Sequence, residues 1–159
     1  MFETRVATVE DAELIAEHRR KMFAEMGDSS AEQLQAMKES FVPWVRERLV
    51  DGRYLGWIVS NGEKVVAGAG VWFMDFLPHW RDLNPQRAYL TNFYVSAEMR
   101  GQGLAHGLVR RAVEAAQTRG IKVVILHASL AGRPIYERNG FKASNEMMLD
   151  LGGESAFED

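Results

Sequence analysis

A glycine-rich segment near the middle of the chain has the residue types of a phosphate-binding turn. Residues 100–105 read RGQGLA and follow an apolar stretch that ends at Val95. Glycines let the backbone approach a ligand closely. The first turn of a helix has four amide hydrogens without internal partners, and the helix dipole places partial positive charge there. A strand, a glycine turn and a helix in this order therefore predict a site for a phosphate or pyrophosphate group.

Two other kinds of glycine turn fit this segment less well. A P-loop needs Lys followed by Ser or Thr after its last glycine, whereas Leu104 and Ala105 follow Gly103 here. A dinucleotide-binding turn expects a third glycine where His106 stands and an acidic residue after the next strand, where His127 stands. A nicotinamide-dependent oxidoreductase is therefore disfavoured.

The composition is that of one ordinary globular domain. The chain has 159 residues, 47% hydrophobic residues, a formal net charge of −3 and no cysteine. The missing cysteines exclude disulfides, thiolate metal sites and a cysteine nucleophile, and they fit a reducing cytoplasm. The charge disfavours a nucleic-acid partner. The first residues lack the apolar core of a signal peptide, and no apolar run approaches the ~20 residues of a membrane span. We therefore expect a cytoplasmic protein without a membrane partner or metal site.

The hydrophobic pattern predicts elements in the order β-α-α-β-β-β-α-β-α-β. The expected strands cover residues 2–7, 54–60, 65–76, 88–95, 122–127 and 141–151, and the expected helices cover residues 8–26, 30–49, 103–119 and 132–138. Pro43 is expected to kink or split the second helix, and Asn61-Gly62 is expected to form a hairpin turn. The fold class is α/β, a mixed sheet with helices on its faces, in a single domain over residues 1–151. Residues 152–159 are expected to be a frayed tail.

Two blocks of sequence together resemble a known enzyme family. Residues 100–105 resemble the (Gln/Arg)-x-x-Gly-x-(Gly/Ala) turn of the GNAT superfamily of N-acetyltransferases. One helix and one strand later, residues 127–141 (HASLAGRPIYERNGF) resemble the family's closing segment with its Tyr-Glu-x-x-Gly-Phe motif. The order of the preceding elements also matches, so the resemblance extends to Leu151. It implies a GNAT fold, acetyl-CoA as co-substrate and acetyl transfer to a primary amine. Transfer would be direct, in a ternary complex, because no cysteine is available to form an acetyl-enzyme.

The resemblance also implies which residues bind acetyl-CoA. The pyrophosphate would lie on the glycine turn. The pantetheine arm would pair with the backbone of residues 93–95, where this strand and the strand at 122–127 diverge. Ser129 stands where the family often has an asparagine that touches pantetheine, and it is a candidate either for that contact or for capping the next helix. The expected cofactor-binding residues are Phe93, Tyr94, Val95, Arg100, Gly101, Gln102, Gly103, Leu104, Ala105, Ser129 and Tyr136.

Acetyl transfer needs a base for the amine, a donor for the oxyanion and an acid for the departing thiolate. The oxyanion donor is expected to be a backbone amide at the end of the strand at 88–95. Tyr136 matches the family position of the acid. The base stays open, because the strand at 88–95 holds no carboxylate. Asp75, His127 and His79 are candidates, beside an ordered water or an acceptor that arrives deprotonated.

The acceptor pocket is expected, by resemblance, from the first two helices and the neighbouring loops. Trp80 and Phe76 are substrate-binding candidates, and Asn92 is a candidate for orienting the acceptor or a water. Further apolar candidates are Met26, Phe41, Trp44, Phe73 and Tyr94. The acceptor is left open among a small amine, an amino acid, an aminoglycoside-like compound and a peptide N-terminus. A homodimer, common in this family, is also left open. The alternative function is an acyl-CoA-binding sensor or regulatory module without turnover, which the missing strand carboxylate allows.

Overall fold

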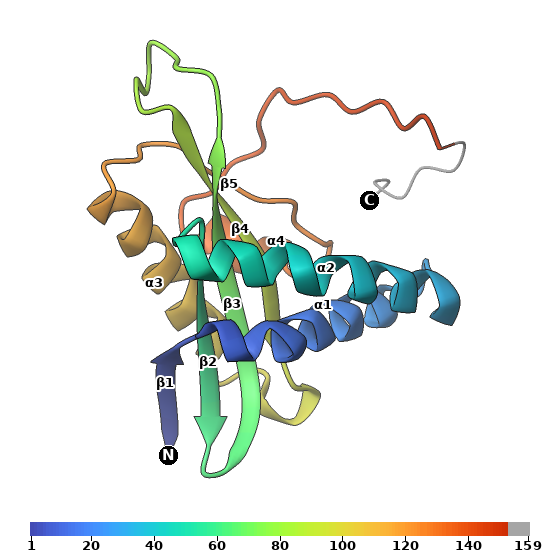
Figure 1. The fold of residues 1–159 in the computed structure, drawn as a ribbon. Coiled ribbons are helices and arrows are strands. Elements are labelled where there is room, and N and C mark those ends of the chain that lie inside the picture. The colour runs from blue at the N-terminus through green and yellow to red at the C-terminus, as the bar shows by residue number, and fades with distance from the viewer. Residues whose placement is uncertain (153–159) are drawn as a thin grey trace. The chain divides into compact units, whose positions relative to one another are not determined.

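A five-stranded sheet forms the centre of the fold (Figure 1). The computed structural model describes residues 1–152, and the chain divides into a unit of residues 1–127, which holds this sheet, and a second unit from residue 128 onward. The elements of the first unit are β1 (Phe2–Val6), the 3-10 helix η1 (Val9–Asp11), α1 (Ala12–Met26), α2 (Ala31–Asp51), β2 (Tyr54–Asn61), β3 (Lys64–Asp75), β4 (Gln86–Val95), the 3-10 helix η2 (Ala97–Met99), α3 (Leu104–Thr118) and β5 (Val124–Ile125). The second unit contains α4 (Arg133–Arg138).

The strands lie in the sheet in their order along the chain. The pairs from β1 to β4 are antiparallel, and β5 joins β4 in parallel. The hairpin predicted between β2 and β3 is present, but its turn lies one residue later than expected. Asn61 pairs with Lys64, and the two residues between them begin with Gly62 at φ 63°. A glycine in the first central position is typical of a type II′ turn, which suits the twist of a hairpin.

The two faces of the sheet carry different helices. Trp72 and Phe73 are neighbours on β3, so their side chains point to opposite faces. The Trp72 ring lies 5.3 Å from the ring of Trp44 on α2, whereas the Phe73 ring lies 3.6 Å from the guanidinium carbon of Arg119, directly after α3. Helices α1 and α2 thus cover one face and α3 the other. The largest fully buried side chains are Phe73, Ile58, Val45, Val59, Val66, Val71 and Val109.

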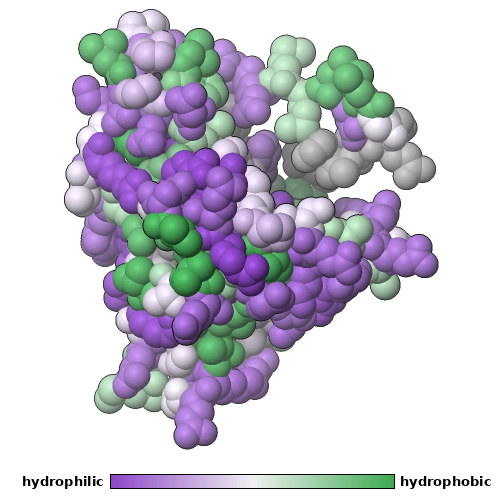
Figure 2. All heavy atoms as spheres, in the orientation of Figure 1, coloured by the Kyte–Doolittle hydropathy of each residue, from purple (hydrophilic) through white to green (hydrophobic). Residues whose placement is uncertain are grey.

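The outer surface of α1 and α2 is largely polar. Figure 2 shows hydrophilic side chains over most of these two helices, with smaller apolar patches beside them. None of the helices in the described part of the chain is both long and apolar enough to cross a bilayer.

Helix α2 continues through Pro43, so of the two predicted effects the split is wrong, and a kink at this residue stays a prediction. A proline inside a helix removes one hydrogen bond to the carbonyl four residues earlier. Here both Pro43 and Glu39, which carries that carbonyl, are exposed to water. Val42 and Val45 on the other side of the helix are buried in the core. Burial of this apolar face outweighs the lost hydrogen bond, because most helical stability in proteins comes from tertiary packing.

Two predicted strands differ from the structure. The strand expected over residues 122–127 shortens to β5, because only Ala88 and Tyr89 of β4 pair with it. The strand expected over residues 141–151 is wrong: this segment has no regular secondary structure. Its apolar residues Met147 and Leu149 are exposed instead. An apolar segment becomes a strand only where a ladder partner is available. The predicted tail lies outside the described residues except for its first one, and a single domain over residues 1–151 stays a prediction.

Candidate functional site

The glycine turn connects β4, through η2, to the first turn of α3. Gly101 and Gly103 have φ angles of 79° and 82°, which glycine adopts without strain. Among the described residues, no backbone carbonyl accepts a hydrogen bond from the amides of residues 101–105. A Cβ atom built on either glycine meets nothing within 4 Å, so the turn faces open space. Unpaired donors at the N-terminus of a long helix fit a diphosphate group.

Arg100 fixes the glycine turn to neighbouring elements. Its Nε donates to the carbonyl oxygen of Val95 at 3.0 Å, and its Nη2 forms an ion pair with Glu25 of α1 at 2.6 Å. Both partners of the ion pair are about half exposed, so the pair contributes little stability. The side chain of Arg100, predicted to bind cofactor, is thus engaged in positioning the turn.

A bulge interrupts β4 just before the turn. Gly70 of β3 pairs with Thr91, but Gly68 pairs with Tyr94, so β4 has one more residue than β3 over this stretch. Asn92, inside the bulge, has a φ of 58°, a left-handed conformation that is uncommon for a residue with a side chain. Such bulges bend a strand, leave backbone groups outside the ladder and are frequent beside active sites.

One edge of β4 is open next to the turn. β5 pairs with β4 only at Ala88 and Tyr89. Beyond Tyr89, no strand in the described part of the chain pairs with this edge. A strand edge that no neighbouring strand covers is where an extended ligand can add along the strand.

Asn92 is buried and connects two other side chains. Its Oδ1 accepts a hydrogen bond from Nη1 of Arg19 on α1 at 2.9 Å, and its Nδ2 donates to the hydroxyl of Tyr54 at 3.0 Å. Burial raises the pKa of Tyr54 to about 12. Gly70 leaves room for the Tyr54 ring, because a Cβ there would lie 1.9 Å from the Tyr54 hydroxyl oxygen. Asn92, predicted to contact the acceptor, thus holds Arg19 in place.

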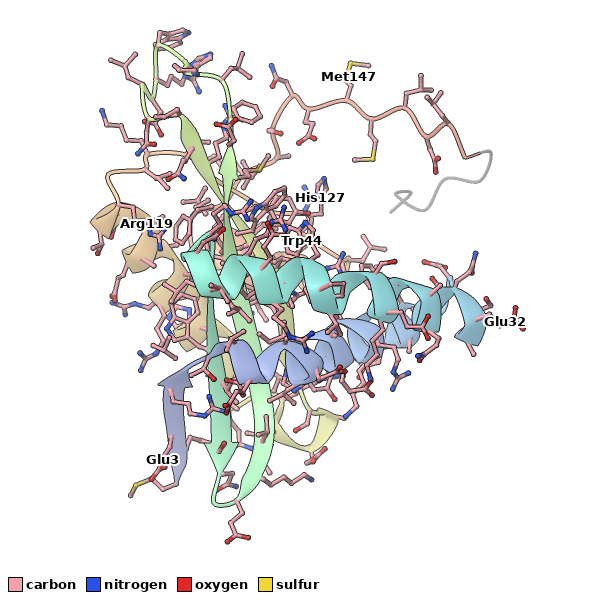
Figure 3. The ribbon with its side chains drawn as sticks, viewed as in Figure 1. Glu3, Glu32, Trp44, Arg119, His127 and Met147 are labelled. Carbon is pink, nitrogen blue, oxygen red and sulfur yellow. The ribbon has the colours of Figure 1, made fainter. Side chains whose placement is uncertain are left out.

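A cavity of about 290 Å³ lies between α1 and α2 and the strands β3 and β4, and it is lined by Arg19, Phe41, Trp44, Trp72, Tyr89 and Thr91. Its rings form a continuous row. The centroids lie 5.6 Å apart for Phe41 and Trp44, 5.3 Å for Trp44 and Trp72, and 6.1 Å for Trp72 and Tyr89. The Tyr89 hydroxyl is hydrogen-bonded to Nδ1 of His127, which is exposed, so the row extends toward solvent. Figure 3 labels Trp44 of this row and His127. This cavity joins an aromatic wall to a titratable side chain.

The predicted base Asp75 does not lie at the cavity. It is the last residue of β3 and is exposed. The alternation of a strand places Asp75 on the same face as Phe73, which packs toward α3, whereas the cavity is on the Trp72 face. Of the predicted bases, His127 is the one that the structure connects to the cavity.

The predicted acceptor residues Phe76 and Trp80 do not line the cavity. The guanidinium carbon of Arg87 lies 3.8 Å from the centre of the Phe76 ring. Trp80 is 79% exposed on the loop between β3 and β4, next to the His79 ring and under the Arg81 guanidinium. Pro78 and Pro85 on either side of Trp80 are typical of a loop, but they carry no information about which way the Trp80 side chain faces.

Arg19, Trp72, Tyr89 and Thr91 were missed in the sequence. A signal for Arg19 was present, because it lies four residues after buried Ile15 and so shares a helix face with it. A charged residue at a core-facing position is rare unless it is paired or functional. The three strand residues carried no such signal, since aromatic residues in strands are usually core.

The second unit is described by itself. Ser129 Oγ accepts a hydrogen bond from the amide of Gly132 at 3.1 Å, which supports the start of α4. Tyr136 on α4 packs edge-to-face on Phe141, with the ring centroids 5.9 Å apart. Burial raises the pKa of Tyr136 to about 12, so its phenol is protonated at neutral pH. The predicted roles of Ser129 and Tyr136 toward acetyl-CoA stay predictions.

A bulged strand with an open edge, followed by a glycine turn at a helix N-terminus, defines an α/β protein built to hold an extended, phosphate-bearing ligand. Residues 12–141 match the model of the acetyltransferase (GNAT) family, and the chain belongs to this family. The family and fold predicted from the sequence are therefore confirmed.

Solved structures resemble the chain over nearly its full length. A GCN5-related N-acetyltransferase from Ralstonia eutropha is 35% identical, with a TM-score of 0.89 over 96% of this chain and 100% of that one. A predicted acetyltransferase from Clostridium acetobutylicum, crystallised with acetyl-CoA, is 28% identical, with a TM-score of 0.88 over 95% of this chain and 97% of that one. Human N-acetyltransferase 8B is 32% identical over 98 residues, which cover 60% of this chain and 41% of the human protein. The chain thus matches about two fifths of the length of this relative.

Proposed function

We propose that the chain is an N-acetyltransferase that moves the acetyl group of acetyl-CoA to the primary amine of a small acceptor, by direct transfer in a ternary complex. The observation that carries this proposal is that residues 1–127 combine three complementary features. They are the open glycine turn, the edge of β4 that no strand of the described residues pairs with beyond Tyr89, and the aromatic cavity on the face covered by α1 and α2. Family membership and the relative crystallised with acetyl-CoA support the same assignment.

The first two features suit the two ends of the coenzyme. The amides of Gln102, Gly103, Leu104 and Ala105 would donate to its diphosphate. The backbone of residues 93–95 would hydrogen-bond its pantetheine arm. When bound, acetyl-CoA supplies a thioester carbon that an amine can attack. A cytoplasmic location and a homodimer stay predictions beside this assignment.

We assign the task of deprotonating the acceptor amine to the Tyr89 and His127 pair. Tyr89 lines the cavity, and its hydroxyl is hydrogen-bonded to Nδ1 of His127. The amine gives its proton to the Tyr89 oxygen while the Tyr89 hydroxyl passes its own proton to Nδ1 of His127. His127 is exposed, so its imidazolium can release the proton to water. The pair ends this transfer as it began, and no carboxylate on β4 is needed.

An acceptor screen that follows free thiol tests the proposed function directly. The full chain is incubated with acetyl-CoA and a panel of amines, and CoA release is measured against a blank without amine. We expect amine-dependent release with at least one acceptor class. Tight acetyl-CoA binding by calorimetry without release for any amine would contradict turnover and favour an acyl-CoA sensor.

A further inference from the structure

We infer that the acceptor is a small amine that also carries a carboxylate, which Arg19 binds, and an apolar or aromatic group, which the aromatic wall of the cavity binds. Amino acids with bulky apolar side chains have this chemistry. The inference rests on the proposed function, because it names the acceptor class of the same cavity.

Arg19 is a cation inside the cavity without an anionic partner. Its Nη1 donates to the neutral oxygens of Asn92 at 2.9 Å and Thr91 at 3.4 Å, and its Nε is buried without any acceptor. Across the described residues, no carboxylate lies within 4.0 Å of this guanidinium. The rings of Phe23 and Phe41, 4.9 and 5.2 Å from its central carbon, hold the group in place. Arg19 is thus positioned, but part of its donor capacity is unused.

Other arginines of the first unit show what Arg19 lacks. Arg5 donates two hydrogen bonds of 2.8 Å to the carboxylate of Asp11, and Arg20 binds Glu17 with two of 2.9 and 2.6 Å. Arg5 is exposed and Arg20 is half-buried like Arg19, yet both are paired with a carboxylate. A cation with a buried donor that has no acceptor is costly, so the half-buried Arg19 with its buried Nε points to an anion that arrives with the ligand.

The geometry of the cavity favours a ligand group with negative charge, a carboxylate, beside Arg19 over a positively charged group. An aromatic wall alone could bind an ammonium group through its ring faces. The guanidinium of Arg19 in the same cavity repels such a group, and that of Arg48 lies 4.2 Å from the centre of the Trp44 ring. The planar fork of an arginine matches the two oxygens of a carboxylate. The rings then accommodate the uncharged, apolar part of the acceptor.

The size of the cavity limits the acceptor. Its volume of about 290 Å³ lies near the lower end of the ~300–1,000 Å³ typical of small-molecule sites. Tyr89 lies on the same wall as the aromatic row and contacts the exposed His127. An acceptor with its carboxylate on Arg19 and its side chain on the rings would therefore direct its amine toward Tyr89.

Matched pairs of amines test this inference. Thiol release is measured for phenylalanine and phenethylamine, leucine and isoamylamine, and tryptophan and tryptamine, where each pair differs by one carboxylate. We expect kcat/KM for the amino acid to exceed that for its decarboxylated amine in at least one pair. Arg19→Gln should lower kcat/KM for that amino acid by about 10- to 100-fold, the range for a hydrogen bond to a charged group. It should change kcat/KM for the decarboxylated amine by less than about threefold.

Two further variants keep the test specific. Arg19→Lys, which keeps the charge but loses the fork, should restore part of the activity with the amino acid. Arg46→Gln removes an exposed arginine on the same helix as Trp44 and should leave every rate unchanged. A wild type without carboxylate preference in any pair, or an equal loss with both amines in Arg19→Gln, would overturn the inference.

A binding measurement separates this inference from the proposed function. Trp44 and Trp72 line the cavity, so their fluorescence reports ligands there. Phenylalanine, leucine and their N-acetyl derivatives are titrated into wild type and Arg19→Gln, and acetyl-CoA affinity is measured in both. Carboxylate binding weakened at least tenfold by Arg19→Gln, at unchanged acetyl-CoA affinity, supports the inference even if no amine releases thiol. Thiol release from simple amines without any binding of these carboxylates contradicts the inference and leaves the proposed function intact.

Discussion

At the scale of single residues, Gly103 is a position where a side chain should disturb the glycine turn. It has a φ of 82° directly before α3. Gly103→Val should reduce acetyl-CoA affinity, measured by calorimetry, at least 100-fold, because the side chain strains the turn and occupies the space proposed for the diphosphate. Gly27→Val is a matched control, since Gly27 has a φ of 81° and equally open surroundings after α1. Both variants should lose about 1–3 kcal/mol of stability. Equal acetyl-CoA affinity in the two variants would remove the turn from the site.

A second residue, His18, should make stability depend on pH. Burial, assisted by the positive charge of Lys21, lowers the pKa of His18 to about 4. The unfolded chain, with an ordinary histidine pKa of about 6.5, binds more protons between pH 6.5 and 4. The free energy of unfolding therefore keeps its full contribution from neutral His18 above pH 6.5. It falls as the pH drops, by about 2 kcal/mol at pH 5.

Denaturant unfolding at pH 7.5 and pH 5 measures this effect of His18. The His18→Phe variant, which can keep the stacking on the Tyr94 ring 4.8 Å away, should lose most of the difference between the two pH values. The paired carboxylate of Glu17 has a pKa of about 2, so it does not titrate in this window. The same pH dependence in both proteins would assign it to another group.

At the scale of elements, glycines in β3 leave space for side chains of neighbouring elements to pack against the strand. A Cβ at Gly70 would lie 1.9 Å from the hydroxyl of Tyr54, which Asn92 holds from the other side. Gly70→Ala should therefore destabilise the protein by more than about 3 kcal/mol, through overpacking around a buried ring. Gly107→Ala in α3, where a Cβ meets nothing within 4 Å, should instead stabilise by about 0.5–1 kcal/mol. Urea unfolding of both variants checks the contrast, and a mild effect at Gly70 would show that Tyr54 can move.

Elements with local signals were predictable, and those that depend on distant partners were not. The glycine turn, the hairpin at Gly62 and the end of α1 at Gly27 follow from residues within a few positions of each other. The length of β5 depends on where β4 diverges from it, and the segment at 141–151 reads as a strand without having a partner. Arg19 carried a local signal in its helix spacing, but the cavity that it lines could not be predicted, since the other lining residues come from α2, β3 and β4, far away in sequence.

At the scale of the whole molecule, the turn, the strand edge and the cavity all lie in residues 1–127. Ligand binding should therefore stabilise the folded state of this unit. Acetyl-CoA at 100 times its Kd should raise the free energy of unfolding by about 2.7 kcal/mol, because it binds the folded state only. The midpoint of thermal unfolding should rise accordingly, and NADPH at the same concentration should leave it unchanged. A shift with NADPH and none with acetyl-CoA would reverse the assignment of the glycine turn.

Beyond Tyr89, no strand of the described residues pairs with the outer edge of β4, where we propose that the coenzyme adds. Backbone amides on this edge of β4 should exchange hydrogen for deuterium with the solvent, whereas amides that are hydrogen-bonded to β3 are protected from exchange. A coenzyme bound along this edge would add a further partner to β4 and slow the exchange of these amides. Mass spectrometry of deuterium uptake would then show which peptides of β4 the coenzyme protects. This measurement does not require the acceptor amine to be known.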